Sequence, residues 1–156
     1  MEENKVALVT GASRGIGRAI AMRLAAAGYD VAVNYNYSEE EANKVVSAIT
    51  ALGRRAIAVK ANAGDRGDVN AMFRTVVKEL GRIDVLVNNA GVVDDAFLLM
   101  LSPDSLDRSL NINVKGYFYC AQAATLKMFK ARRGAIINIS SVSSLMALPG
   151  QSVYAA

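Results

Sequence analysis

Short apolar runs alternate with helical patterns along the whole chain. The runs occupy residues 5–10, 30–35, 56–61, 82–88 and 134–140 and are rich in β-branched and aliphatic side chains. They are apolar nearly throughout, which is typical of strands that are covered on both faces. Because parallel strands are joined by right-handed helical crossovers, the alternation predicts an α/β protein with a doubly wound, five-stranded parallel sheet. The binding crevice of such a sheet lies at the carboxyl ends of its strands.

The segments between the runs carry signals of helix starts and stops. Ile16, Ile20 and Leu24 recur at helical spacing and predict the apolar face of the first helix. Ser38 and Glu41 predict a capping box at the start of the second helix. A fourth helical region is predicted from Ser102-Pro103 to about Arg132, with a possible break at Gly116, and the predicted helix stops are Gly28, Gly53 and Gly81.

The composition excludes several classes of site. The sequence has no histidine and one cysteine, Cys120, so it predicts no metal site, no disulfide and no histidine-based catalytic triad. Cys120 is interpreted as a packing residue of a helix. Any acid–base chemistry is therefore expected from Tyr, Lys, Asp or Glu.

The charge pattern restricts location and partners. No apolar run approaches the length of a membrane helix, and the start MEEN is acidic, so the sequence predicts a cytoplasmic protein without a membrane partner. The net charge is +4, but basic residues are scattered apart from Arg54-Arg55 and the stretch 127–133. This pattern favours anionic small molecules or an acidic partner over nucleic acid.

A glycine-rich loop follows the first predicted strand. TGASRGIG, residues 10–17, has glycines that permit a tight turn and a close approach of the backbone to a pyrophosphate. It is not a P-loop, because Gly17 is followed by Arg18-Ala19 and not by Lys-Ser/Thr. A glycine-rich loop between a strand and a helix predicts dinucleotide binding.

The end of the second predicted strand bears on the choice of cofactor. An acidic residue there would hold a ribose hydroxyl and repel a 2′-phosphate, but the residues are Asn34-Tyr35-Asn36. Arg14, in the glycine loop, offers a guanidinium for that phosphate. NADP(H) is therefore predicted, with NAD(H) as the alternative.

Four separated motifs together resemble the short-chain dehydrogenase/reductase family. They are Thr10-Gly11-x3-Gly15-x-Gly17, the run 88–91 (NNAG), Asn113 within NINVKG, and Ser141 followed at thirteen residues by Tyr154. The resemblance covers the chain from Lys5 to Ala156. It implies a single NAD(P)-binding Rossmann domain over residues 1–156.

The resemblance also implies roles for particular residues. Hydride arriving at a carbonyl carbon leaves charge on the oxygen, so a proton donor and a group that positions the oxygen are needed. Tyr154 would be the donor, Ser141 would position the oxygen, and Asn113 would hold a water in a proton relay. Together with the loop and strand-end arguments, the expected cofactor contacts are Gly11, Ser13, Arg14, Gly15, Ile16, Gly17, Asn34, Asn62, Ala63, Asn89, Ala90 and Gly91.

Within the family, the sequence looks most like the 3-oxoacyl-[acyl-carrier-protein] reductases. This implies reduction of a 3-oxoacyl thioester with NADPH, an acyl carrier protein as a possible partner, and a homo-oligomer, either a dimer or a tetramer. Two alternatives remain open: a reductase for another small ketone, sugar or polyol, and an inactive nucleotide-binding fragment.

The end of the sequence departs from the family pattern. In relatives a lysine follows the tyrosine by four residues, but here only Ala155 and Ala156 follow Tyr154. The family fold also continues with further C-terminal strands. The resemblance therefore predicts a C-terminally incomplete domain, and poor catalysis by any protein that ends at Ala156.

Overall fold

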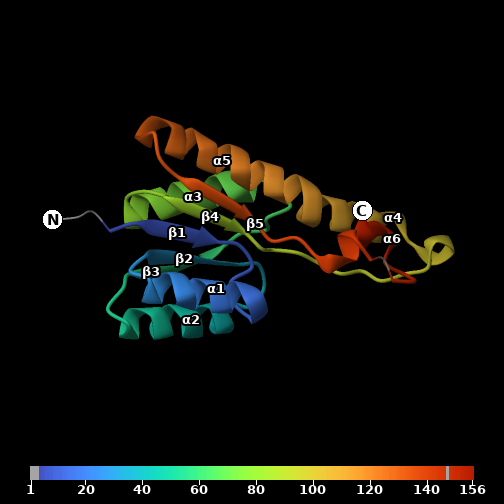
Figure 1. Cartoon of the computed structure of the whole chain (residues 1–156), viewed down its shortest axis with the longest axis horizontal. Helices are drawn as coiled ribbons and strands as arrows, with labels where there is room; N and C mark the ends of the chain where they lie inside the picture. Colours follow the sequence, from blue (N-terminus) through green and yellow to red (C-terminus); the bar gives the residue numbers. More distant parts are fainter. Residues whose placement is uncertain (1–3, 147) are drawn as a thin grey trace.

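The centre of the molecule is a parallel sheet of five strands (Figure 1). The computed structural model describes residues 4–146 and 148–156. The strand order β3-β2-β1-β4-β5 confirms the predicted doubly wound α/β fold. The strands are β1 Val6–Val9, β2 Asp30–Tyr35, β3 Ala56–Lys60, β4 Val85–Asn88 and β5 Ala135–Asn138.

Helices cover both faces of the sheet and bury its side chains in two cores. Helices α1 (Gly15–Ala26) and α2 (Glu39–Ala51) lie on one face, and α3 (Arg66–Leu80) and α5 (Gly116–Ala131) lie on the other (Figure 1). Because side chains alternate between the faces of a strand, Leu8 belongs to the α3/α5 core and Val9 to the α1/α2 core.

Strand β1 lies at the point where the chain reverses its direction across the sheet. It pairs with β2 on one side and with β4 on the other. The Thr10 N–H, just beyond β1, donates to the Val87 carbonyl at 3.0 Å. The loops after β1 and β4 therefore leave the sheet side by side, as expected for a binding crevice at a topological switch point.

Burial across the sheet differs from the sequence prediction at both edges. In β3, at one edge, only Val59 is buried. Strands β1, β2 and β4 are buried throughout, as their apolar sequences predict. Strand β5 has the same apolar character, but its Ile136 and Ile137 are 36% and 46% exposed. The physical reason is position, because among the described residues β3 pairs only with β2 and β5 only with β4, so these two strands form the edges of the sheet.

Two details of the first helices differ from prediction. The face of α1 that packs on the sheet consists of Gly17, Ala21 and Ala25, whereas Ile16 is 66% exposed. Small residues let α1 approach the sheet closely, and of the predicted stripe Ile20 and Leu24 are half-buried and pack against the α1/α2 core, whereas Ile16 does not. The capping box of α2 is also absent, because Ser38 makes no side-chain cap and the Glu41 carboxylate pairs with Lys44 at 2.7 Å.

The fourth helical region is continuous but not uniform. Ser102 caps α4 (Pro103–Leu110) by accepting from the Ser105 N–H at 3.1 Å, as predicted. A π-helical turn, η2 (Asn111–Lys115), then leads directly into α5, so there is no break at Gly116. Helix α5 ends at Ala131, and its C-cap residue Arg132 has a left-handed φ of 51°. Within residues 4–146 and 148–156, no helix has the length and apolar character needed to cross a membrane.

Cys120 faces the interior of the α3/α5 core. Its side chain is fully buried, and burial raises the pKa of the thiol to about 12. A thiol of this kind stays protonated and unreactive at neutral pH. The interpretation of Cys120 as a packing residue is confirmed.

Candidate active site

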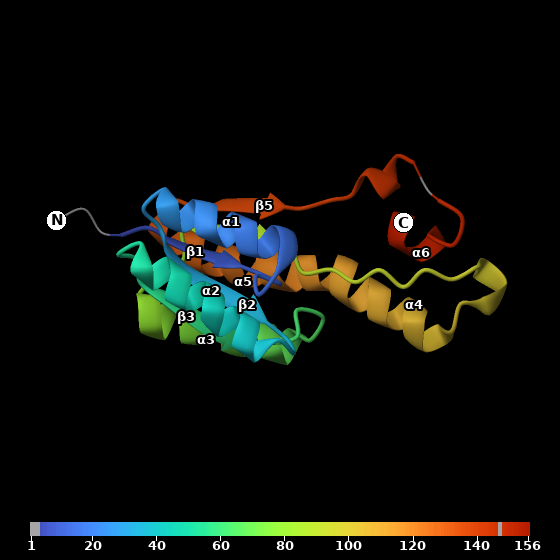
Figure 2. The ribbon, with the colours of Figure 1, turned by 90° about the horizontal axis from the view of Figure 1, so that it is seen from below.

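A cavity of about 610 Å³ lies beyond the carboxyl ends of β4 and β5. The segments after these two strands extend past the sheet together with α4 and the short helix α6 (Ser152–Ala155) (Figure 2). The cavity brings together residues that are far apart in the sequence. Its lining includes six predicted site residues, Ile16, Asn89, Gly91, Asn113, Ser141 and Tyr154.

The glycine loop beside this cavity is shaped by close contacts. A Cβ on Gly11 would lie 2.9 Å from Ala90 Cα, and a Cβ on Gly17 would lie 2.3 Å from the Gly11 carbonyl oxygen. Gly15 has a φ of 55°, and no atom lies within 4 Å of where its Cβ would be. Helix α1 then starts at Gly15 with no side-chain cap and no acidic residue in its first turn. An uncapped helix start beside open space fits a phosphate group, so the residues present suit a dinucleotide.

Substitutions at the two glycines that flank Ile16 are expected to lower the free energy of unfolding by different amounts. Gly17→Ala should lower the free energy of unfolding by about 2–3 kcal/mol, because the new methyl overlaps backbone. Gly15→Ala should cost only about 1 kcal/mol, because the space is open and only the left-handed φ is strained. Chemical denaturation of both variants checks this, and equal costs would contradict the packing described for Gly17.

Thr10 ties the end of β1 to the segment after β4. Its hydroxyl oxygen accepts from the N–H groups of Asn89 at 2.9 Å and Ala90 at 3.0 Å. The Asn89 amide in turn donates to the carbonyls of Thr10 and Gly11, at 2.9 Å and 3.2 Å. These bonds fix the glycine loop against the predicted cofactor residues Asn89 and Ala90. Thr10 was not among the predicted site residues, although its place directly after the first strand is the signal for it.

The Asn34 side chain is buried and forms its hydrogen bonds with other groups of the protein. Its Oδ1 accepts from the Gly11 N–H at 3.1 Å. Its amide group donates to the carbonyls of Tyr35, Val59 and Ala61 at 3.3, 3.2 and 3.0 Å. The side chain predicted to contact the cofactor is thus fully engaged in holding the loop against β2 and β3. Arg14, by contrast, is exposed at the start of α1, and Ser13 before it is buried.

Asn62 and Ala63 lie in the turn that follows β3. The Asn62 side chain accepts from the Gly64 N–H at 3.0 Å, and its backbone N–H donates to Asp68 at 2.9 Å. Ala63 is buried, and a Cβ on Gly116 would lie 2.7 Å from its carbonyl oxygen. This turn therefore packs against the start of α5, and it does not line the cavity.

Asn113 stands in the π-helical turn and faces the segment after β4. Its amide donates to the Val92 carbonyl, and its Oδ1 accepts from the Val92 N–H, both at 2.9 Å. The side chain therefore clamps the backbone one residue beyond Gly91. Its role in a water relay stays a prediction.

Ser141 and Tyr154 come from separate segments and line the same cavity. The Ser141 hydroxyl oxygen accepts from the Ser143 N–H at 3.1 Å, at the start of η3 (Val142–Ser144). Tyr154 is the third residue of α6, half-buried. No hydrogen bond joins the two hydroxyls in the described part of the chain.

The segment that carries Ser141 is held to the segment after β4. The Ala96 N–H donates to the Gly150 carbonyl at 2.9 Å. The Gln151 amide group accepts from the Ser143 hydroxyl at 3.1 Å and donates to Asp95 at 3.4 Å. Further along, the Arg108 guanidinium forms two hydrogen bonds to Asp94 and lowers the pKa of that carboxyl. These contacts join the two walls of the cavity.

The end of the sheet beside the cavity carries a hydrogen-bond network that the sequence did not predict. The Tyr117 hydroxyl donates to the Ile139 carbonyl at 2.9 Å, and burial is the main cause that raises the pKa of this phenol. The Asn88 amide donates to Asn138 Oδ1 at 2.9 Å and to the Tyr117 carbonyl at 3.3 Å. No sequence pattern identifies this network, because it depends on the pairing of β4 with β5.

Known proteins match this chain over 97–100% of its length. The chain is 49% identical to the 3-oxoacyl-[acyl-carrier-protein] reductase FabG of Staphylococcus aureus (strain Mu50) over 156 residues, which are 100% of this chain and 63% of that protein. It is 46% identical over 152 residues to the 3-oxoacyl-[acyl-carrier-protein] reductase of Synechocystis, covering 97% of this chain and 62% of that protein. The chain thus spans less than two thirds of the curated relatives it matches.

Solved structures agree with the fold. A short chain dehydrogenase from Burkholderia cenocepacia in complex with NADP superposes with a TM-score of 0.89 at 42% identity, over 99% of this chain and 63% of that one. An acetoin dehydrogenase from Enterobacter cloacae superposes with a TM-score of 0.93 at 35% identity, over 99% and 62%. The family model of the short chain dehydrogenases matches residues 5–156. This match covers the whole sheet, the glycine loop and the cavity, and the chain belongs to the short chain dehydrogenase family.

Proposed function

We propose that the protein is an NADPH-dependent carbonyl reductase, and that residues 1–156 form its nucleotide-binding Rossmann domain. The observation that carries the proposal is the shared cavity. Asn89 and Gly91 from the end of β4 meet Ser141 and Tyr154 from the end of β5 and from α6. A cofactor held at the switch point would lie beside the two hydroxyls that carbonyl reduction needs.

The glycine loop and its surroundings would hold the cofactor. The uncapped start of α1 and the open space at Gly15 suit the pyrophosphate. The exposed Arg14 suits a 2′-phosphate, which supports NADP(H) over NAD(H). A related structure was solved in complex with NADP. When bound, the nicotinamide would supply the hydride.

Tyr154 and Ser141 would handle the carbonyl oxygen of the substrate. Reduction places negative charge on that oxygen, and a hydroxyl donor in contact with it lowers the barrier. Tyr154 would give up its phenolic proton, and the Ser141 hydroxyl would donate a hydrogen bond that positions the oxygen. The contact of Ser141 with the Ser143 N–H uses its acceptor capacity only, so its own proton is available for this purpose.

The substrate class is proposed to be a 3-oxoacyl thioester. The support is the identity of 46–49% to relatives named as 3-oxoacyl-[acyl-carrier-protein] reductases. A small ketone is the second candidate, because an acetoin dehydrogenase superposes with a TM-score of 0.93 over 99% of this chain. We further propose an acyl carrier protein as the partner, a homo-oligomeric assembly and a cytoplasmic location.

Steady-state assays on the purified protein test this function. NADPH oxidation should be seen with a 3-oxoacyl thioester and should be weaker with acetoin or another small ketone. Intact mass is measured first, so that turnover is assigned to a chain of known length. NADPH binding without turnover of either substrate would support a nucleotide-binding role alone, and the absence of NADPH binding would overturn the proposal.

A further inference from the structure

Two polar side chains, those of Ser143 and Gln151, lie beside the candidate active site without lining its cavity. Ser143 is two residues beyond Ser141, and Gln151 is three residues before Tyr154. Both are half-buried, and the Ser143 hydroxyl donates a hydrogen bond to Gln151 Oε1 at 3.1 Å. This bond therefore joins the two segments that carry the candidate hydroxyls.

The backbone of Ser143 holds the Ser141 side chain. The Ser143 N–H donates to the Ser141 hydroxyl oxygen at 3.1 Å. The Ser144 hydroxyl donates to the Ser141 carbonyl at 2.7 Å, so Ser141 is bound to η3 through both its side chain and its backbone. A shift of Ser143 would therefore move the Ser141 hydroxyl with it.

Gln151 is the residue at which α6 begins. It is the N-cap residue of this helix, and its carbonyl accepts from the Ala155 N–H at 2.8 Å. The Gln151 amide group also donates to Asp95, beyond β4, at 3.4 Å. Because a helix of one turn is not stable by itself, the orientation of α6 depends on the contacts at its start. The placement of Tyr154 within α6 therefore follows that of Gln151.

The chain between these two residues is open to solvent. The described residues of 144–149 are exposed, and Leu145 is 88% exposed. None of the described residues of 140–156 belongs to the buried cores on either face of the sheet. Core packing therefore does not set the separation of Ser141 and Tyr154, which leaves it to surface contacts and to hydrogen bonds across the loop.

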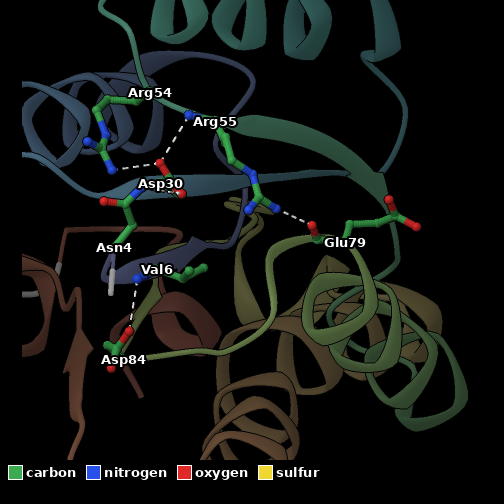
Figure 3. Close-up of polar contacts among 7 residues, drawn as sticks. All are labelled: Asn4, Val6, Asp30, Arg54, Arg55, Glu79 and Asp84. Atoms are coloured by element: carbon green, nitrogen blue, oxygen red, sulfur yellow. Dashed lines mark hydrogen bonds and ion pairs between the residues drawn. The ribbon is translucent and has the colours of Figure 1, made fainter. Parts of the chain in front are cut away.

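Polar contacts at the amino-terminal ends of the strands have a different setting. Asp30 accepts from the Arg54 guanidinium at 2.8 Å, and Asp84 accepts from a β1 N–H at 2.9 Å (Figure 3). Both carboxylates are buried, Asp30 at the start of β2 and Asp84 just before β4. Such contacts stabilise the sheet itself, whereas the bond between Ser143 and Gln151 lies outside it. Loss of that bond should therefore affect the candidate active site more than the fold.

We propose that Ser143 and Gln151 are positioning residues, whose hydrogen bond sets the placement of the Ser141 hydroxyl relative to Tyr154. The inference rests on the proposed function, carbonyl reduction, in which both hydroxyls must reach the same substrate oxygen. A misplacement of about 1 Å can lower a rate by about 100-fold. Because neither side chain lines the cavity, each acts through the residue that it holds and not on the substrate.

The variants Ser143→Thr and Ser143→Val test this role. Threonine and valine have nearly the same shape, but only threonine keeps a hydroxyl that can donate to Gln151. With the better of the thioester and ketone substrates, kcat should be at least about tenfold lower in Ser143→Val than in Ser143→Thr, as expected for a displacement of less than about 1 Å. The KM for that substrate and the affinity for NADPH should agree within about twofold between the two variants, because the binding surfaces are unchanged.

Gln151→Met gives a second measurement of the same bond. Methionine keeps the length of the side chain and removes its amide group. This variant should also lower kcat, and adding Ser143→Val to it should cause no further loss, because both changes remove the same bond. Losses that multiply in the double variant would show that the two side chains act separately, and would contradict the inference.

Other results would overturn the inference and leave the proposed function intact. Equal kcat values for Ser143→Val and Ser143→Thr would show that the hydroxyl is not required. A higher KM with unchanged kcat would place Ser143 in contact with the substrate, and weaker NADPH binding by Ser143→Val alone would make the bond a requirement of the cofactor site. If the parent protein binds NADPH but reduces neither substrate, the proposed function itself fails, and this inference fails with it.

Discussion

Replacing Tyr154 by phenylalanine is expected to lower kcat for carbonyl reduction by at least about 100-fold, the lower bound for loss of a positioned general acid. Tyr154 lies in α6 and lines the cavity, and phenylalanine fills the space of its ring and removes only the hydroxyl. The shape of the cavity and the glycine loop should be unaffected, so NADPH affinity should stay within about twofold. Steady-state kinetics and a fluorescence titration with NADPH measure the two quantities separately.

Tyr119→Phe is the matched control for this variant. Tyr119 is half-buried against the α3/α5 core and does not line the cavity. Its loss of a hydroxyl should leave kcat unchanged. If Tyr154→Phe turned over at the rate of the parent protein, Tyr154 could not be the proton donor, and Tyr117, which lines the same cavity, would be the next candidate.

The sequence predicted the sheet and its switch point because both depend on local patterns. Apolar runs of strand length and helical spacing between them are sufficient to identify β1 to β5 and the helices that cross over. The pattern does not distinguish a central strand from an edge strand, because both are built from β-branched residues. The exposure of β5 follows from which strands lie beside it, and this is a property of the whole sheet.

The candidate site was predictable only in part, for the same reason. Ser141 and Tyr154 were found through their spacing, and the structure places both in one cavity with Asn89. The actual partners of Asn34 and Asn113 could not be read from the sequence, because they are backbone groups of distant segments. Both asparagine side chains form hydrogen bonds with backbone groups, so each stabilises the segments that surround the site.

Asn34 therefore allows a sharp test of how the glycine loop is held. In the parent protein the Asn34 amide donates to three carbonyl oxygens. Asn34→Asp keeps the shape of the side chain but replaces this donor by a carboxylate oxygen. An ionised carboxylate there is buried, unpaired and repelled by those oxygens. The variant should lose about 3–5 kcal/mol of unfolding free energy at neutral pH, as expected for an uncompensated buried charge.

The loss should depend on pH in a defined direction. The carbonyls and burial favour a protonated aspartate, so its pKa in the folded variant lies above the value of about 3.9 for an unfolded chain. The folded variant then binds its proton more tightly than the unfolded chain, and stability falls as pH rises above about 4. Denaturation at pH 5 and at pH 8 should show the smaller difference from the parent protein at pH 5.

Asn36→Asp, two residues further along, is the control for this variant. Asn36 is half-buried and makes no hydrogen bond to the described residues, so the same change should cost less than about 0.5 kcal/mol at either pH. A similar small cost for Asn34→Asp would mean that the loop does not depend on the Asn34 amide. A large cost that falls at low pH, accompanied by weaker NADPH binding, would instead show that the shape of the cofactor loop depends on the bonds that the buried Asn34 amide donates to the Tyr35, Val59 and Ala61 carbonyls.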